Sequence, residues 1–163
     1  MISAARVSTD HRTRLIPSVN LLALIGEQVG TATGAELRPL LDEACQHLNN
    51  LLLPHMEAAE RAIYPELERL MQNRHSMTPM RREHREIRAL VADLDQRRQS
   101  LGDGPVSIGS AVALRRALFR LYGLLKVHLA EEQLYADIVE HRLTPEAEAE
   151  LAIAMQHQGV EEA

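Results

Sequence analysis

The chain has a single cysteine, Cys45, among its 163 residues. One thiol excludes an internal disulfide and any site built from several cysteines, such as a cysteine-rich zinc site or an iron–sulfur cluster. Cys45 lies within a helical apolar pattern, where we expect it to be a small packing residue. Any metal site in this chain must therefore be built from other side chains.

The sequence also has no long hydrophobic run and no stripe of basic residues. The longest apolar stretch near the N-terminus, residues 19–25, is too short to span a bilayer, and no small-residue cleavage site follows a charged start. The net charge is -5, with Arg and Glu mixed along the surface rows, which argues against nucleic-acid binding. We expect a cytoplasmic protein with neither a membrane nor a nucleic acid as partner.

Aromatic residues are few, with one Phe and no Trp, whereas Leu, Ala, Glu and Arg dominate. The apolar residues recur at helical rather than alternating spacing, which predicts an all-α fold. The length is typical of one domain with a real hydrophobic core. We predict a single domain over residues 1–163, with a helical core at about 9–142 and a short tail helix at about 145–157.

Four long helices account for most of the chain. The first is predicted to begin near Asp10, after candidate caps at Ser8 and Thr9, and to stop before Gly30. The second runs from about residue 35 to 74, the third from an N-cap at Thr78 to before residue 101, and the fourth over about 107–142. Short connections between long amphipathic helices favour an antiparallel up-down-up-down four-helix bundle.

Two prolines fall inside the second predicted helix, Pro54 and Pro65. An interior proline removes a backbone hydrogen bond, so we expect a bend at both places. The first bend precedes a histidine, and the second would carry the end of this helix away from the bundle axis.

One histidine interrupts the apolar stripe of each long helix, and these are His11, His55, His84 and His128. Residues three, four and seven apart share a helix face, so each imidazole stands where the pattern asks for a core residue. A lone histidine of this kind is usually a core residue hydrogen-bonded to a neighbour. Four stripes that each carry one indicate a metal site inside the bundle.

A carboxylate strengthens this interpretation. Glu132 follows His128 by four residues, which places both side chains about 40° apart on one helix face. The pair lies between Leu125 and Tyr135 on the inward stripe. Burying an ionised carboxylate without a partner is costly, and a cation between the helices would remove that cost.

With these residues placed, the chain resembles the hemerythrin-like (HHE cation-binding) family from His11 to about residue 143. The likeness is carried by four segments, which are residues 10–12, 53–65, 82–88 and 121–132. The resemblance implies an antiparallel four-helix bundle with two non-haem irons bridged by two carboxylates and an oxygen. It makes His11, His55, His84 and His128 terminal ligands and Glu132 one bridging carboxylate, and zinc or manganese would also accept such ligands.

The family's second bridging carboxylate follows the second histidine by four residues, and here that position is Ala59. Glu60 comes one residue later and points roughly 140° away from His55 on an ideal helix. A local bulge would rotate Glu60 into the site, and we predict that Glu60 is a metal ligand. The other outcomes are one bridging carboxylate, weak binding, a single metal, or completion of the site by solvent or Tyr64.

The resemblance implies a protein that binds, senses or reacts with a small ligand such as O2, NO or H2O2. The sequence assigns no enzymatic activity, although redox activity toward peroxide or NO stays open, and a sensor would need a separate protein partner. Two alternatives remain. A ferritin-like di-iron oxidase needs Glu-x-x-His on two helices, which this chain lacks; a metal-free helical bundle would act through its surface.

Overall fold

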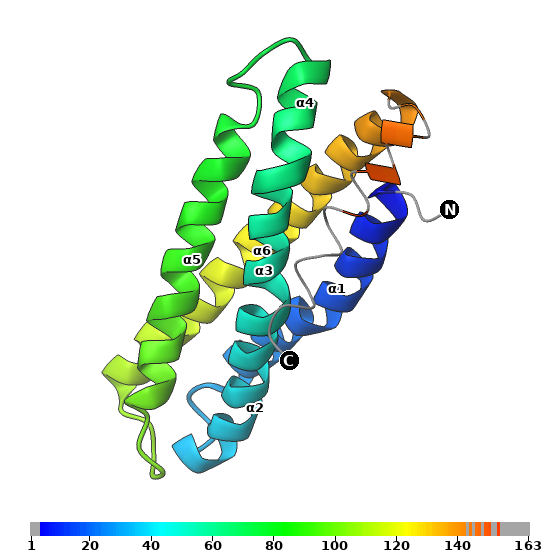
Figure 1. Cartoon of the computed structure of the whole chain (residues 1–163). Coiled ribbons are helices and arrows are strands. Elements are labelled where there is room, and N and C mark those ends of the chain that lie inside the picture. The colour runs from blue at the N-terminus through cyan, green and yellow to red at the C-terminus, as the bar shows by residue number, and fades with distance from the viewer. Residues whose placement is uncertain (1–3, 143, 145, 148, 151–152, 154–163) are drawn as a thin grey trace.

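The computed structural model describes the backbone of residues 4–142, 144, 146–147, 149–150 and 153. It describes the side chains of residues 13–139, 144, 146–147, 149–150 and 153. The predicted antiparallel four-helix bundle is confirmed (Figure 1). Its first helix is α1 (Ala4–Gln28). The second is one continuous column of α2 (Gly34–His47), η1 (Leu48–Leu52), α3 (Leu53–Ala58), η2 (Ala59–Ile63) and α4 (Tyr64–Leu70).

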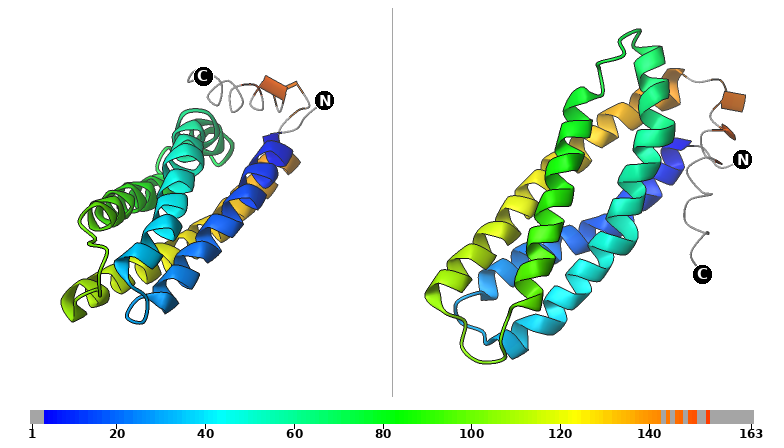
Figure 2. Two further views of the ribbon diagram at one scale, coloured as in Figure 1. Left: turned by 90° about the horizontal axis from the view of Figure 1, so that it is seen from below. Right: turned by 60° about the vertical axis from the view of Figure 1, so that its left-hand side comes forward.

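The bundle is completed by α5 (Thr78–Gln99) and α6 (Ile108–Arg142). α1 packs against α2 and α6, and α5 packs against the same two helices from the other side (Figure 2). Consecutive helices are therefore neighbours, as expected for short connections. None of the described helices is long and apolar enough to cross a membrane.

The helix ends differ from the prediction at the starts of α1 and α5, and the second column ends at Leu70 rather than near residue 74. α1 begins at Ala4, about six residues before Asp10, because Ser, Thr and Asp cost only a few tenths of a kcal/mol inside a helix and do not force a start. α2 begins at Gly34, where Thr33 and Glu36 form a reciprocal capping box. α5 has Met77 rather than Thr78 at its N-cap, whereas Ser107 caps α6 by accepting from the Ser110 N–H (3.2 Å).

Of the three prolines in the second column, Pro54 and Pro65 each follow a widened π turn, whereas Pro39 lies inside α2. The Leu53 N–H donates to the Leu48 carbonyl in η1, and the Tyr64 N–H donates to the Ala59 carbonyl in η2. The residue whose N–H closes each turn directly precedes a proline, Pro54 or Pro65. A proline lacks the N–H and its ring crowds the carbonyl four residues back, so an extra residue in the preceding turn relieves that contact.

The interior contains two apolar clusters, one above the other. The larger is built from leucines and other aliphatic residues of α1, α2, α5 and α6. The smaller lies around α4 and the start of α5, with Ala59, Tyr64, Leu67, Met77 and Met80. The buried polar side chains of the described part are Ser18, His55, His84, His128 and Glu132, and the last four occupy the level at which one cluster gives way to the other.

The tail helix predicted at about 145–157 falls largely on residues outside the described part of the chain.

Candidate metal centre

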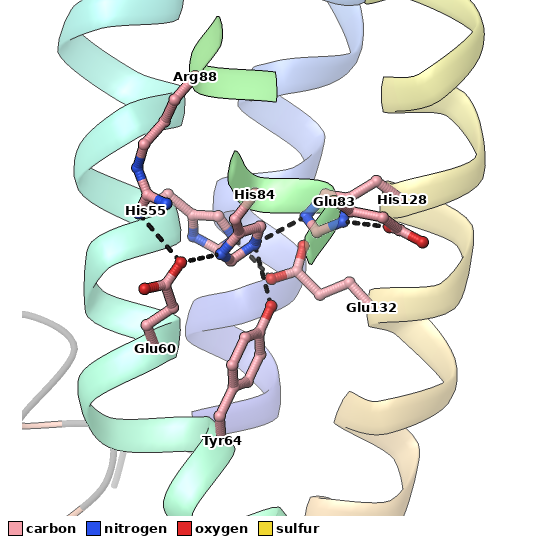
Figure 3. Close-up of polar contacts among 8 residues, drawn as sticks. All are labelled: His55, Glu60, Tyr64, Glu83, His84, Arg88, His128 and Glu132. Carbon is pink, nitrogen blue, oxygen red and sulfur yellow. Dashed lines mark hydrogen bonds and ion pairs between the residues drawn. The ribbon is translucent and has the colours of Figure 1, made fainter. Parts of the chain in front are cut away.

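Three of the four predicted histidines and the predicted carboxylate meet in the interior (Figure 3). His55 is on α3, His84 on α5, and His128 and Glu132 are on α6. Their exposed fractions are 3%, 0%, 0% and 5%. Neighbouring helices thus bring together side chains from three separate parts of the chain, at the place where the apolar pattern predicted them.

The ring of His84 is held from both of its nitrogens. Its Nδ1 lies 2.6 Å from Oε1 of Glu60, which also accepts from the guanidinium of Arg88 (3.0 Å). Its Nε2 lies 3.0 Å from the hydroxyl of Tyr64, whose ring stacks on the imidazole with centroids 5.4 Å apart. Because a carboxylate only accepts, the Nδ1 of His84 carries the proton and donates to Glu60.

His128 is held in the same way by another carboxylate. Its Nδ1 lies 3.0 Å from Oε2 of Glu83, so this nitrogen also carries the proton and donates. Its Nε2 faces the Nε2 of His84 at 3.2 Å. At this distance the contact suits either a proton on one of the two nitrogens or a cation shared between them.

Electrostatics keep His84 neutral. Burial, followed by the nearby charge of His128, lowers the pKa of His84 to about 4, although the hydrogen bond and charge of Glu60 oppose this. Tyr64 stays protonated, because burial and then the charges of Glu132 and Glu60 raise the pKa of its hydroxyl. The Tyr64 O–H therefore donates to the unprotonated Nε2 of His84.

His55 and Glu132 form a buried pair with 2.7 Å between Nε2 and Oε1. Burial disfavours the charged form of each side chain, but their mutual attraction outweighs this effect. The charge of Glu132 and its hydrogen bond raise the pKa of His55, and the charge and hydrogen bond of His55 hold the pKa of Glu132 well below its usual range. The second oxygen of Glu132, Oε2, has no hydrogen-bond partner among the described residues.

The two remaining predicted ligands are Glu60 and His11. Glu60 does lie in the predicted bulge, η2, but the structure places it at Nδ1 of His84, whereas His128 lies at Nε2 of the same ring. His11 lies in α1, and its side chain is outside the described part of the chain.

Two other residues of the site were not predicted. The side chain of Glu83 is only 21% exposed and contacts His128. Arg88 supports Glu60. Nothing in the local sequence distinguishes either residue from other surface charges of an Arg- and Glu-rich helix. Their place in the site depends on a partner side chain from another helix.

The pattern of one histidine per helix, held by carboxylates, agrees with a comparison of the sequence with known families. Residues 19–139 match the family described as the hemerythrin HHE cation-binding domain. The chain belongs to this hemerythrin family. Searches of curated proteins and of solved structures gave no match.

The match covers about three quarters of this hemerythrin-like chain and includes His55, His84, His128 and Glu132, whereas His11 lies before its first residue. As an HHE domain, the chain is a cation-binding protein. Its second helix departs from the family pattern at Ala59, which is fully buried in the smaller apolar cluster.

The donor atoms of the hemerythrin-like site decide whether it fits a cation. Within the described residues no three His, Cys, Asp or Glu side chains already converge on one point; the donors meet in pairs. Two nitrogens bound at right angles to one ion lie about 3.0 Å apart for metal–nitrogen distances of about 2.1 Å, close to the 3.2 Å between His84 and His128. The buried Glu132 Oε2 adds an oxygen that lacks a partner in the described part, so the donors fit a cation.

Proposed function

We propose that this hemerythrin-like protein holds two non-haem irons and binds, senses or reacts with a small ligand such as O2, NO or H2O2. The proposed ligands are His11, His55, His84, His128 and Glu132. The observation that carries the proposal is the 3.2 Å approach of the Nε2 atoms of His84 and His128 in the bundle interior, with each Nδ1 committed to a carboxylate.

Each side chain has a distinct task in this arrangement. His84 and His128 form one half of the centre, and His55, with His11 from α1, forms the other. Glu132 contacts His55 through Oε1 and would hold metal through Oε2. Iron bound here would supply redox chemistry and open coordination positions for a small ligand, since five side chains are fewer than two six-coordinate ions require.

The outer carboxylates orient the rings. Glu60 and Glu83 accept from the Nδ1 atoms of His84 and His128, which fixes both rings with Nε2 toward the centre and makes Nε2 a better donor. Arg88 keeps Glu60 in position through the same oxygen that His84 uses. We therefore propose that Glu60 is a positioning residue. It was predicted to be a ligand because Ala59 stands where the family has its second carboxylate.

Tyr64 is the better candidate to replace the missing carboxylate. Its hydroxyl lies at Nε2 of His84, on the same side of the ring as His128, and it follows Glu60 by one helical turn. The hydroxyl stays a neutral donor as long as no cation is bound, and a bound cation favours the phenolate. A visible charge-transfer band in the iron-loaded protein that disappears in Tyr64→Phe would show this oxygen on the metal.

Metal analysis tests the proposal as a whole. Protein expressed with iron available and purified without a histidine tag should contain about two irons per chain, because neutral imidazoles and a buried carboxylate suit iron. A value below about 0.3 metal per chain at neutral pH would contradict the metalloprotein interpretation. It would favour the alternative, a metal-free bundle that acts through its surface.

A third prediction concerns the positioning carboxylate. Glu60→Gln should lower iron affinity by about tenfold, since an orienting partner is weakened while all ligands remain. Glu86→Gln is the matched control on α5, because Glu86 pairs with Arg120 at the surface. Affinity is measured by competition with a chelator of known strength. Equal affinities for Glu60→Gln and the parent would remove Glu60 from the site.

A further inference from the structure

A hollow of about 190 Å³ lies between α1 and α6 and opens to solvent. Its lining is mainly apolar and consists of Ile16, Val19, Asn20, Lys126, Leu129 and Ala130. Ile16 and Ala130 are exposed, whereas Val19 and Leu129 are only 2% and 4% exposed. The exposed side chains therefore form the mouth of the hollow, and Val19 and Leu129 form its floor.

We propose that this hollow is the entrance through which an uncharged diatomic ligand reaches the metal centre, and that Leu129 controls its passage. The inference rests on the proposed function and narrows it to ligands such as O2 and NO. It is carried by the level of the hollow along the bundle, by the order of side chains around α6, and by the ion pairs in the neighbouring helix contacts.

The hollow and the centre lie at the same level of the bundle. The α6 part of the lining runs from Lys126 to Ala130, and His128 lies within this span. Glu132 follows Ala130 by two residues, which is about 3 Å along the helix axis. The hollow is thus beside the proposed ligands of α6 rather than above or below them.

Around α6, Leu129 stands between the hollow and Glu132. Counted from His128 at 100° per residue, Glu132 lies at about 40° and Leu129 at about 100°. Ala130, at about 200°, is on the outer side of the helix. His128 is directed at α5 and Glu132 at α3, and Leu129 continues this rotation toward α1. Its side chain is therefore the layer that separates the hollow from the carboxylate.

The inner end of this route is the Oε2 atom of Glu132. This oxygen is buried and has no hydrogen-bond partner among the described residues, and it is the atom that would hold metal. A ligand that passes Leu129 therefore arrives beside the metal.

The neighbouring helix contacts at this level are bridged by ion pairs. Arg88 on α5 contacts Glu60 in η2 (3.0 Å), and Glu83 on α5 contacts His128 on α6 (3.0 Å). Opening either contact would break an interaction that holds a ligand ring in place. A rotamer change of Leu129 breaks no hydrogen bond, because its side chain has neither a donor nor an acceptor.

The apolar passage also selects the class of ligand. O2 and NO are small, uncharged and weakly hydrated, so they enter aliphatic space as other small apolar molecules do. Hydrogen peroxide would give up its hydrogen bonds to water at Leu129 and find no partner there, which is costly. The entrance therefore favours a diatomic gas over peroxide.

Dissolved O2 tests the route in the metal-free protein. O2 is paramagnetic and speeds the nuclear relaxation of the protons that it reaches. In NMR of the metal-free parent, the methyl groups of Leu129 and the ring protons of His128 should show this effect. Ala130→Phe fills the mouth from an exposed position and should abolish most of the effect at His128. Val127→Phe is the matched control and should leave it unchanged, because Val127 is exposed on α6 and lies outside the lining.

Rapid mixing with NO tests the passage in the iron-loaded protein. Leu129→Ala should raise the association rate constant about tenfold and Ala130→Phe should lower it about tenfold, changes within the range that variants of one binding site span. Leu125→Ala is the control for Leu129→Ala, because Leu125 is also buried one turn earlier on α6 and lies outside the lining. Thermal unfolding shows whether each variant folds; if Leu129→Ala does not, Ala130→Phe decides.

Two results would overturn the inference. One is equal O2 relaxation of the His128 ring in the parent and in Ala130→Phe. The other is an association rate constant for NO that is the same in the iron-loaded parent and in Ala130→Phe. An iron content below about 0.3 per chain would instead overturn the proposed function, and O2 relaxation in the metal-free protein would still decide whether the hollow leads to the interior.

Discussion

His128→Ala should yield protein with almost no bound iron and with a lower stability. The substitution removes one of the two facing Nε2 donors and leaves the other, on His84, without its partner. It also separates Glu83 from the ring that it holds. His128 is fully buried, so the cavity left behind should cost about 2 kcal/mol or more of unfolding free energy even without metal.

The matched control is His75→Ala. His75 is an exposed histidine in the connection between α4 and α5, and its removal should change neither iron content nor stability. Iron per chain by elemental analysis and urea unfolding of chelated protein give the two readouts. If His75→Ala loses iron as completely as His128→Ala, the assignment of the inward helix faces is wrong.

Acid should destabilise the metal-free protein by about 2 kcal/mol between pH 6.5 and 4.5. The pKa of buried His84 is lowered from 6.5 to about 4, so the unfolded chain takes up a proton in this window and the folded chain does not. Stability therefore falls as the pH drops from 6.5 toward 4. His55, whose pKa is raised, adds only a small opposite slope near pH 6.5, because it is already protonated in the folded chain there and the unfolded chain completes its protonation just below.

Glu132, whose pKa is lowered, also stabilises the folded state. This contribution is lost only as the pH falls below the ordinary pKa of a glutamate, about 4.5. Urea unfolding of chelated protein at pH 6.5, 5.5 and 4.5 measures the effect. His84→Gln should flatten the dependence by at least half. A parent whose stability is the same at all three values would show that His84 is protonated in the folded state.

Four features of the fold followed from local sequence rules. Helical spacing of the apolar residues predicted four long helices, and short connections predicted their antiparallel order. Pro54 and Pro65 indicated irregular turns, which the structure has as η1 and η2. Each inference used residues within one or two turns of each other, where helix geometry fixes their relation.

The histidines and Glu132 were predicted by the same means. His55, His84, His128 and Glu132 stand at apolar positions of their helices, so the pattern by itself placed them inside, and the structure buries all four. The ligand role of His11 stays a prediction. For Glu60, we propose a positioning role in place of the predicted ligand role.

Only the tertiary structure decided which carboxylate faces which ring. Glu60 lies 24 residues from His84 and Glu83 lies 45 residues from His128, and neither pairing follows from helix periodicity. They depend on the rotation of η2, where one extra residue per turn changes the direction of every side chain after it, and on how α5 and α6 pack. The sequence alone determined a cation-binding four-helix bundle with inward histidines; packing between helices decided which nitrogen of each ring is held by a carboxylate and which is directed at the centre.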